Sequence, residues 1–166
     1  MYTELRGARD VALRQWLLAI IVGLGVFAAW IHLDRPGIAF ESGPGFDPGT
    51  PDGRIDPLLA GLRLFGLVLI VPVMEELFWR SFVMRWIDSR DFLAADPARV
   101  SAFAFAATCG LFALEHSLWL AGLLAGVAYG GLYLRTRNLW VTILSHAVTN
   151  GALGVWIVTT GNWRFW

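Results

Sequence analysis

Five long apolar stretches dominate this 166-residue sequence and restrict the folds open to it. They lie at about residues 16–33, 58–87, 100–116, 118–134 and 139–159. A helix needs about 20 mostly apolar residues to cross the hydrocarbon core of a bilayer, and it satisfies its own backbone hydrogen bonds there. We therefore expect an all-α, polytopic membrane protein in which about five transmembrane helices form a bundle.

The rest of the composition supports this class. Asp, Glu, Lys and Arg make up 16% of the residues, against about 25% in typical soluble domains. The length allows a single domain over residues 1–166, with residues 34–57, rich in Pro, Gly and Asp, as an extramembrane loop. The formal net charge of zero argues against a nucleic-acid partner. The lipid bilayer is the expected surroundings, and the oligomeric state is not predicted.

The arginines predict the orientation in the membrane. Basic residues near the ends of spanning helices collect on the cytoplasmic side. Nine of them fall on one side if the N-terminus is cytoplasmic: Arg6, Arg9, Arg14, Arg80, Arg85, Arg90, Arg99, Arg135 and Arg137. No small-residue cleavage site closes the first apolar stretch, so we interpret it as a transmembrane helix rather than a signal peptide.

Two adjacent carboxylates lie inside the second apolar stretch, where charged groups indicate function. Glu76 and Arg80 are four residues apart, so they share a helix face and can form an ion pair. Glu75 is rotated by about 100° from Glu76. A poorly solvated carboxylate left without that partner is suited to act as a general base. The alternative is a buried ion pair that only orients two helices, but that role does not require the second carboxylate.

Two histidines and an asparagine complete the candidate set. His116 closes the third stretch, and Phe112, one turn earlier, would form a wall beside its imidazole. His146 and Asn150 are four apart on the fifth helix, and their N–H groups can together stabilise an oxyanion. The alternative for this pair is hydrogen bonding that holds helices together.

Small residues mark expected packing surfaces. Gly122, Gly126 and Gly130 recur every four residues and would let neighbouring backbones approach closely. Cys109 is the only cysteine, which excludes an internal disulfide, and we expect it to be a small packed side chain.

The motifs EELFWR, FALEH and HAVTN, in this order, resemble those of the CPBP family, the CAAX-prenyl-protease and bacteriocin-processing (Abi-type) proteins. The resemblance covers about residues 57–160, the motif-bearing core. The segments EELFWRSFVMRWI, EHSLWLAGLLAGVAYGGLY and TTGNWRFW also look like a bacterial subgroup associated with exosortase systems.

This resemblance implies an intramembrane endopeptidase of the glutamate type in a bacterial cytoplasmic membrane, acting on membrane-associated proteins or peptides. It implies that Glu75 and His116 activate water, that His146 and Asn150 form the oxyanion hole, and that Glu76 and Arg80 support the site. No cofactor is expected from it. The family's prenyl proteases have about eight spans, so a prenylated substrate does not carry over to a chain with five.

Three alternatives remain. Zinc could be held by Glu75, Glu76, His116 and His146, although the chain lacks the H-E-x-x-H helix. The chain could instead be a catalytically silent membrane scaffold or immunity-type protein, or a proton-coupled carrier that uses the two glutamates.

One point of geometry opposes a shared site. Glu75 lies ten residues from Arg85 and His146 nine from Arg137, which places both at about 14–15 Å of depth at helical rise. His116 lies seventeen residues from Arg99, or about 26 Å. One plane can hold all three only if the third helix starts outside the membrane or is strongly tilted.

Overall fold

The computed structural model describes residues 11–35, 39, 43–96 and 99–166. Their order is α1 (Leu13–His32), a helical run over 57–88, α5 (Ala102–Leu114), α6 (Trp119–Thr136), α7 (Leu139–Thr160) and the short 3₁₀ helix η4 (Trp163–Phe165). The described residues form no β-strand, and one isolated bridge joins Gly49 to Ile55. The prediction of an all-α fold is confirmed.

The helical run from Pro57 to Asp88, here called the long helix, is continuous but not uniform. It consists of α2 (Pro57–Phe65), the π segment η2 (Gly66–Ile70), α3 (Val71–Glu76), the π segment η3 (Leu77–Val83) and α4 (Met84–Asp88). The Asp56 carboxylate caps its start by accepting from the N–H groups of Leu58 and Leu59, and Pro57 follows at the first helical position. The two π segments flank the pair of glutamates.

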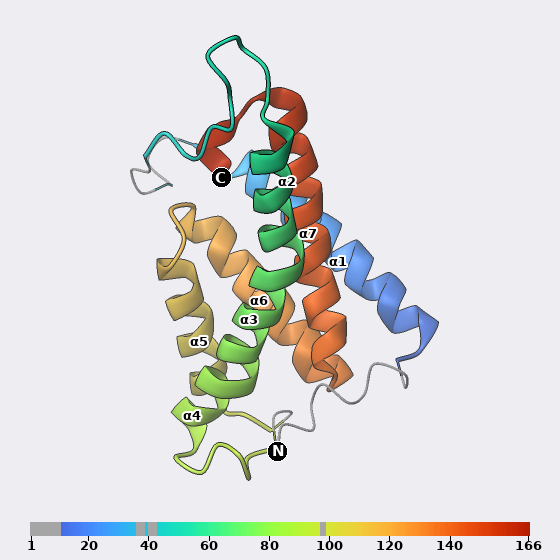
Figure 1. The fold of residues 1–166 in the computed structure, drawn as a ribbon. Coiled ribbons are helices and arrows are strands. Elements are labelled where there is room, and N and C mark those ends of the chain that lie inside the picture. Colours follow the sequence, from blue (N-terminus) through green and yellow to red (C-terminus); the bar gives the residue numbers. More distant parts are fainter. Residues whose placement is uncertain (1–10, 36–38, 40–42, 97–98) are drawn as a thin grey trace.

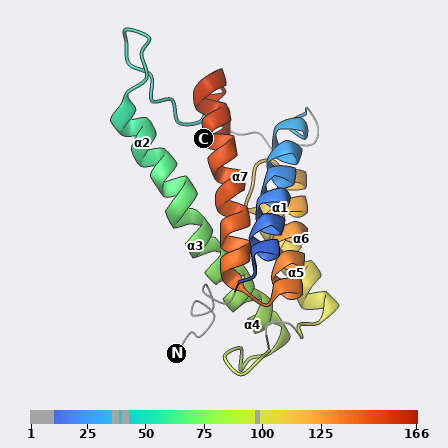
Figure 2. The same cartoon turned by 90° about the vertical axis from the view of Figure 1, so that its right-hand side faces the viewer.

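Helix α7 lies at the centre of the bundle, between α1 and the upper part of the long helix, and α6 packs against α1, α5 and α7 (Figures 1 and 2). A Cβ added to Gly23 of α1 would lie 2.4 Å from the Ser145 carbonyl, so these two backbones meet closely. The expected stripe on α6 faces α5, where a Cβ on Gly126 would lie 3.2 Å from the Cα of Cys109. The packing roles predicted for the stripe and for the buried Cys109 are thus confirmed.

Among the described residues, three helices are long and apolar enough to cross a membrane: α1, the long helix and α7. The predicted third span, residues 100–116, forms only the 13-residue helix α5. At 1.5 Å per residue it is about 20 Å long, shorter than a hydrocarbon core of about 30 Å. The fourth predicted span is the 18-residue α6. The expected count of five spans is therefore not confirmed.

The two ends of the bundle differ. The start of α1, the described part of the connection from α4 to α5 and the turn from α6 to α7 lie at one end, and the described residues of the predicted loop 34–57 lie with the C-terminal segment at the other (Figure 1). The described residues of that loop contain no helix. The predicted orientation depends in part on Arg6 and Arg9, which lie outside the described residues.

Two of the arginines used to predict orientation are not exposed charges. Arg80 is 1% exposed and lies inside the bundle. Arg85 is buried and donates to the carbonyls of Leu93 and Ala95 at 3.2 and 3.0 Å, which fixes the chain after α4. Interior contacts therefore account for the positions of these two arginines, and they do not serve as evidence for the orientation.

Candidate active site

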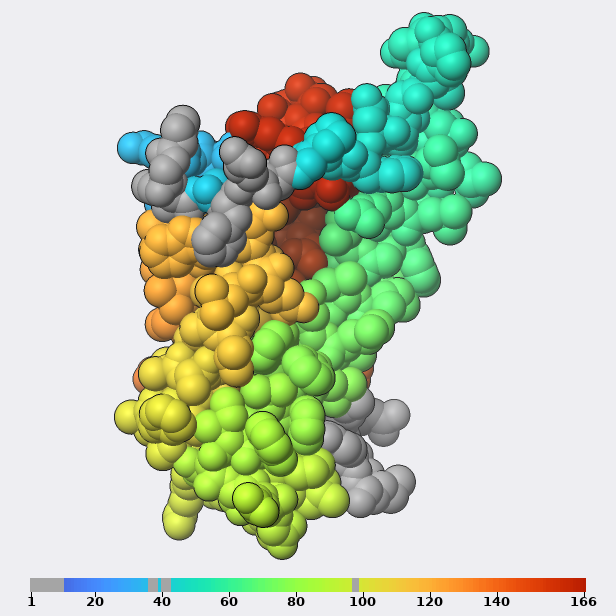
Figure 3. All heavy atoms as spheres, turned by 90° about the vertical axis from the view of Figure 1, so that its left-hand side faces the viewer, coloured from blue at the N-terminus to red at the C-terminus, as the bar shows by residue number. Residues whose placement is uncertain are grey.

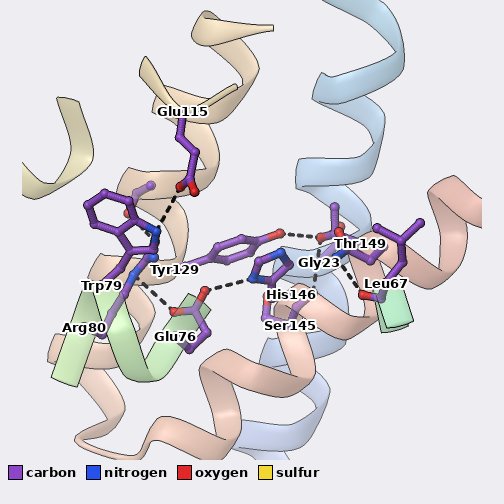
Figure 4. A network of polar contacts seen from close by, with 12 residues as sticks. Gly23, Leu67, Glu76, Trp79, Arg80, Glu115, Tyr129, Ser145, His146 and Thr149 are labelled. Atoms are coloured by element: carbon purple, nitrogen blue, oxygen red, sulfur yellow. Dashed lines mark hydrogen bonds and ion pairs between the residues drawn. The ribbon is translucent and has the colours of Figure 1, made fainter. Parts of the chain in front are cut away.

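Glu76 lies at the centre of a buried polar network (Figure 4). Its Oε2 lies 3.1 Å from the Nε of Arg80, and both side chains are almost fully buried. Its Oε1 lies 2.9 Å from the Nδ1 of His146, on the facing helix α7. The i,i+4 ion pair expected from the sequence is confirmed, and the carboxylate has an additional partner that the spacing did not reveal.

The Arg80 guanidinium is enclosed by aromatic rings. Its central carbon lies 4.6 Å from the centre of the Phe112 ring and 5.7 Å from that of Tyr129, both within the range of cation–π attraction. The ring centre of Phe112 also lies 4.7 Å from that of His116. Phe112 thus forms a wall beside the imidazole, as expected, and in addition it covers the buried arginine.

Sequence reasoning missed a hydrogen-bonded chain that supports His146. Tyr129 of α6 stacks on the imidazole, with ring centres 4.9 Å apart and an interplanar angle of 20°. Its hydroxyl donates to Thr149 at 2.7 Å, and the Thr149 hydroxyl donates to the carbonyl of Gly23 at 2.8 Å (Figure 4). Thr149 lies three residues after His146 on the same helix face, and this spacing could have indicated that it belongs to the site. This chain connects α1 to the site.

The four residues predicted to be catalytic line one cavity of about 160 Å³: Glu75, His116, His146 and Asn150. The objection from helical depth does not hold, because His116 lies in the turn after the short α5 and reaches the same cavity. Glu75 is half-buried, and its buried Oε2 has no hydrogen-bond partner among the described residues. Figure 3 shows a hollow between the residues around the start of α6 and the upper half of the long helix, with α7 at its floor.

The hydrogen bonds of the two imidazoles determine what each can offer to the cavity. The Nδ1 of His116 lies 2.7 Å from the carbonyl of Phe112, which can only accept, so Nδ1 carries the proton. Neutral His116 therefore presents the lone pair of Nε2 and can act as a base. His146 also donates from Nδ1, to Glu76. It can donate to an oxyanion through Nε2 only when the ring is doubly protonated.

Asn150 is held by a carbonyl that the long helix leaves free. The N–H of Val71 bonds five residues back to Gly66, in the π pattern. The next donor in that pattern would be residue 72, but Pro72 has no N–H. The carbonyl of Leu67 is left over, and the Asn150 Nδ2 donates to it at 2.9 Å. One N–H of the carboxamide is thereby used, and its second N–H remains for another acceptor.

The same contacts bear on the alternative with zinc. Both oxygens of Glu76 already face positive or N–H partners, so this carboxylate does not fit the expected set of four ligands. Among the described residues, no group of three or more His, Cys, Asp or Glu side chains is arranged to hold a metal ion. Glu115, beside His116, accepts instead from the Trp79 indole at 3.2 Å.

Comparison with known protein families identifies the family of this chain. The family model described as Rce1-like, type II CAAX prenyl endopeptidase, matches residues 57–152, more than half of the chain. The match includes the long helix, α5, α6 and the part of α7 that carries His146 and Asn150. No curated protein and no solved structure matches the chain.

Proposed function

Because the chain belongs to the Rce1-like family of type II CAAX prenyl endopeptidases, we propose that it is an intramembrane endopeptidase that cleaves membrane-associated proteins or peptides. Members of this family are membrane proteases, and the apolar helices make this chain an integral membrane protein. Its place in a bacterial cytoplasmic membrane with the N-terminus inside is part of the same proposal.

The observation that supports the proposal most directly is the shared cavity. Glu75, which has an unpartnered carboxylate oxygen, lies there with His116, His146 and Asn150. A buried polar atom without a partner is unfavourable for folding, and such atoms persist where function requires them. A structural ion pair would not explain Glu75, because Glu76 alone pairs with Arg80.

The proposed reaction uses these groups in two pairs. Glu75, with the lone pair of His116 Nε2, takes a proton from water as the water oxygen attacks the scissile carbonyl carbon. The carbonyl oxygen becomes an oxyanion, which accepts hydrogen bonds from the second N–H of Asn150 and from doubly protonated His146. When the tetrahedral intermediate collapses, the C–N bond breaks and the proton moves to the leaving amine.

Glu76 and Arg80 do not react in this scheme. Glu76 accepts from His146 Nδ1 and thereby fixes the orientation of the imidazole beside the cavity. Arg80 compensates the Glu76 charge inside the bundle. The substrate need not be prenylated, because only the motif-bearing core supports the family resemblance.

The experiment that tests the function compares membrane proteomes of cells that carry wild-type or Glu75→Gln protein. We expect full-length precursors to accumulate with Glu75→Gln, since the amide cannot take a proton from water. The control is Asp52→Asn, the same chemical change in the exposed loop. Equal proteomes for wild type and Glu75→Gln, with biological function retained, would instead support a scaffold.

A further inference from the structure

A second cavity of about 500 Å³ lies next to the one lined by Glu75, His116, His146 and Asn150, which we call the inner cavity. It is formed where the end of α1, the loop around residues 43–45, the turn from α5 to α6 and the C-terminal segment meet. Its volume is in the range of about 300–1,000 Å³ that is usual for ligand sites. We call it the outer cavity, because it lies at the end of the bundle that carries the predicted extramembrane loop.

The two cavities meet at three shared residues: Trp30, His116 and Phe165. The indole of Trp30 stands edge-on to the imidazole of His116, with ring centres 5.2 Å apart. Two aromatic side chains from opposite ends of the chain therefore lie at the junction of the two cavities, beside an imidazole that we assign to water activation.

The segments that carry these two aromatic residues are tied together. Asp34, four residues after Trp30, forms an ion pair with Arg164, the neighbour of Phe165. The Phe46 N–H donates to the carbonyl of Trp166 at 3.3 Å, which holds the C-terminal segment against the loop. These two contacts hold the C-terminal segment against both the end of α1 and the loop.

The lining of the outer cavity indicates what could occupy it. It combines polar residues (Asp34, Glu115, Ser117 and Arg164) with aromatic and aliphatic ones (Trp30, Leu118, Phe165 and Trp166). Such a mixed lining suits a polypeptide, which offers N–H and C=O groups as well as side chains, whereas an acyl chain would require an apolar wall throughout.

We propose that the outer cavity binds an extended, extramembrane segment of the protein substrate, and that the passage between Trp30 and Phe165 admits its scissile region to His116. The proposal rests on the proposed protease function. Trp30, Asp34, Arg164 and Phe165 all lie outside the family match at residues 57–152, so these residues would control substrate entry independently of the matched part of the chain, which carries the proposed chemistry.

The passage can be tested by cysteine labelling without any substrate. Leu153 of α7 lines the inner cavity only and has no role in the proposed reaction. In a Cys109→Ala background, Leu153→Cys is treated with a cationic methanethiosulfonate that does not cross membranes, added to spheroplasts. We expect modification from the side on which Arg54→Cys, a fully hydrated marker in the loop, is also modified.

Widening the passage should accelerate this reaction. Trp30→Ala should raise the rate constant for Leu153→Cys by about tenfold, equivalent to about 1.4 kcal/mol in the barrier to entry. Phe165→Ala, on the opposite wall, is the second variant. It should raise the same rate constant, and it provides the test if Trp30→Ala does not fold. The matched control is Val155→Cys, an exposed apolar position on the same helix, which should stay unmodified because a charged reagent does not enter lipid.

Two results would overturn the proposal: no modification of Leu153→Cys from the side that modifies Arg54→Cys, or rate constants unaffected by both alanine variants. Labelling does not depend on catalysis, so failure of the protease assignment is recognised separately, by equal proteomes for wild type and Glu75→Gln. If both assignments hold, Trp30→Ala should also alter which precursors are cleaved.

Discussion

Glu75 and Glu76 are neighbours in the sequence but belong to two contrasting regions of the molecule. Glu76 belongs to a closed network with Arg80, His146, Tyr129 and Thr149, in which each side chain has polar or aromatic partners. Glu75 lies on the wall of the inner cavity, with His116 and Asn150, and keeps a carboxylate oxygen without a partner.

The contrast follows from helix geometry, since consecutive residues point about 100° apart. One carboxylate is directed at the packed helices and the other at the cavity. The closed network fixes the helices in place, and the cavity wall keeps groups with unused hydrogen-bonding capacity. His146, Tyr129 and Thr149 belong to both regions, because they take part in the network and also line the cavity.

The largest effect on stability is expected from opening the closed network. Arg80→Ala leaves the Glu76 charge buried without its guanidinium, and removal of one partner from a buried pair typically costs about 3–5 kcal/mol. Thermal unfolding in detergent should show a large loss. The control is Arg54→Ala, which breaks an ion pair in the exposed loop and should change the unfolding temperature little.

A second variant separates charge from packing in the same network. Glu76→Gln combined with Arg80→Met removes both charges, so it should be less destabilised than Arg80→Ala alone. Wild-type stability for Arg80→Ala would show that the pair does not hold the helices, and the contrast between the two regions would then be lost.

The next effect concerns Asn150, on the cavity wall. Asn150→Ala should lower turnover by about 10²- to 10³-fold, the usual loss for one oxyanion donor. The apparent substrate affinity should change little, because this hydrogen bond strengthens only as charge develops. Asn162→Ala, in the C-terminal segment, is the control and should leave turnover as in wild type.

Asn150 also satisfies the carbonyl of Leu67, so its loss is expected to reduce stability. Adding Pro72→Ala returns a backbone N–H that can bond to that carbonyl. The double variant should regain stability but not turnover. Recovery of both would show that Asn150 acts only through the long helix.

The part of the site that lies on a single helix could be predicted from the sequence. Helical spacing alone gives the pairing of Glu76 with Arg80 and the divergence of Glu75, and both are found. The packing role of the glycine stripe of α6 could also be predicted, because small residues at every fourth position lie on one helix face and let a neighbouring helix approach closely.

Contacts between helices could not be predicted in this way. The chain from Tyr129 through Thr149 to Gly23 depends on how three helices cross, which residue spacing does not fix. The length of α5 was overestimated at both ends, because the predicted span ran from Val100 to His116, whereas Ser101 caps the start of the helix and the helix ends at Leu114, before the polar residues of the turn. The two π segments depend on how the long helix packs and on Pro72, so they cannot be predicted from the pattern of hydrophobic residues.

A third, smaller effect tests whether α1 supports the closed network from outside the family match. A Cβ at residue 23 would clash with the Ser145 carbonyl and with Val148, so Gly23→Ala should destabilise the protein by about 1–3 kcal/mol, as overpacking does. The matched control is Gly25→Ala, on the same helix with no atom within 4 Å of the added Cβ. It should be neutral or slightly stabilising, since alanine favours helices. Equal unfolding temperatures for the two variants would show that α1 is not closely packed on α7.

The smallest effect is expected from a metal chelator, and it tests the chemistry of the cavity wall directly. If Glu75 and His116 activate water themselves, protein treated with a strong chelator should keep its activity, and elemental analysis should find no stoichiometric zinc. A zinc enzyme would lose activity on chelation and regain it with zinc, because the metal would activate the water and polarise the carbonyl.

Glu76 is poorly placed to be a zinc ligand, since its carboxylate contacts both Arg80 and His146 and would have to give up one of these contacts to bind a metal. Metal-dependent activity would therefore require Glu75, His116 and His146 to supply the ligands, and it would move the oxyanion role from Asn150 to the metal. In that case Asn150→Ala should have only a small effect on turnover, so the chelator and the asparagine variant must give consistent answers.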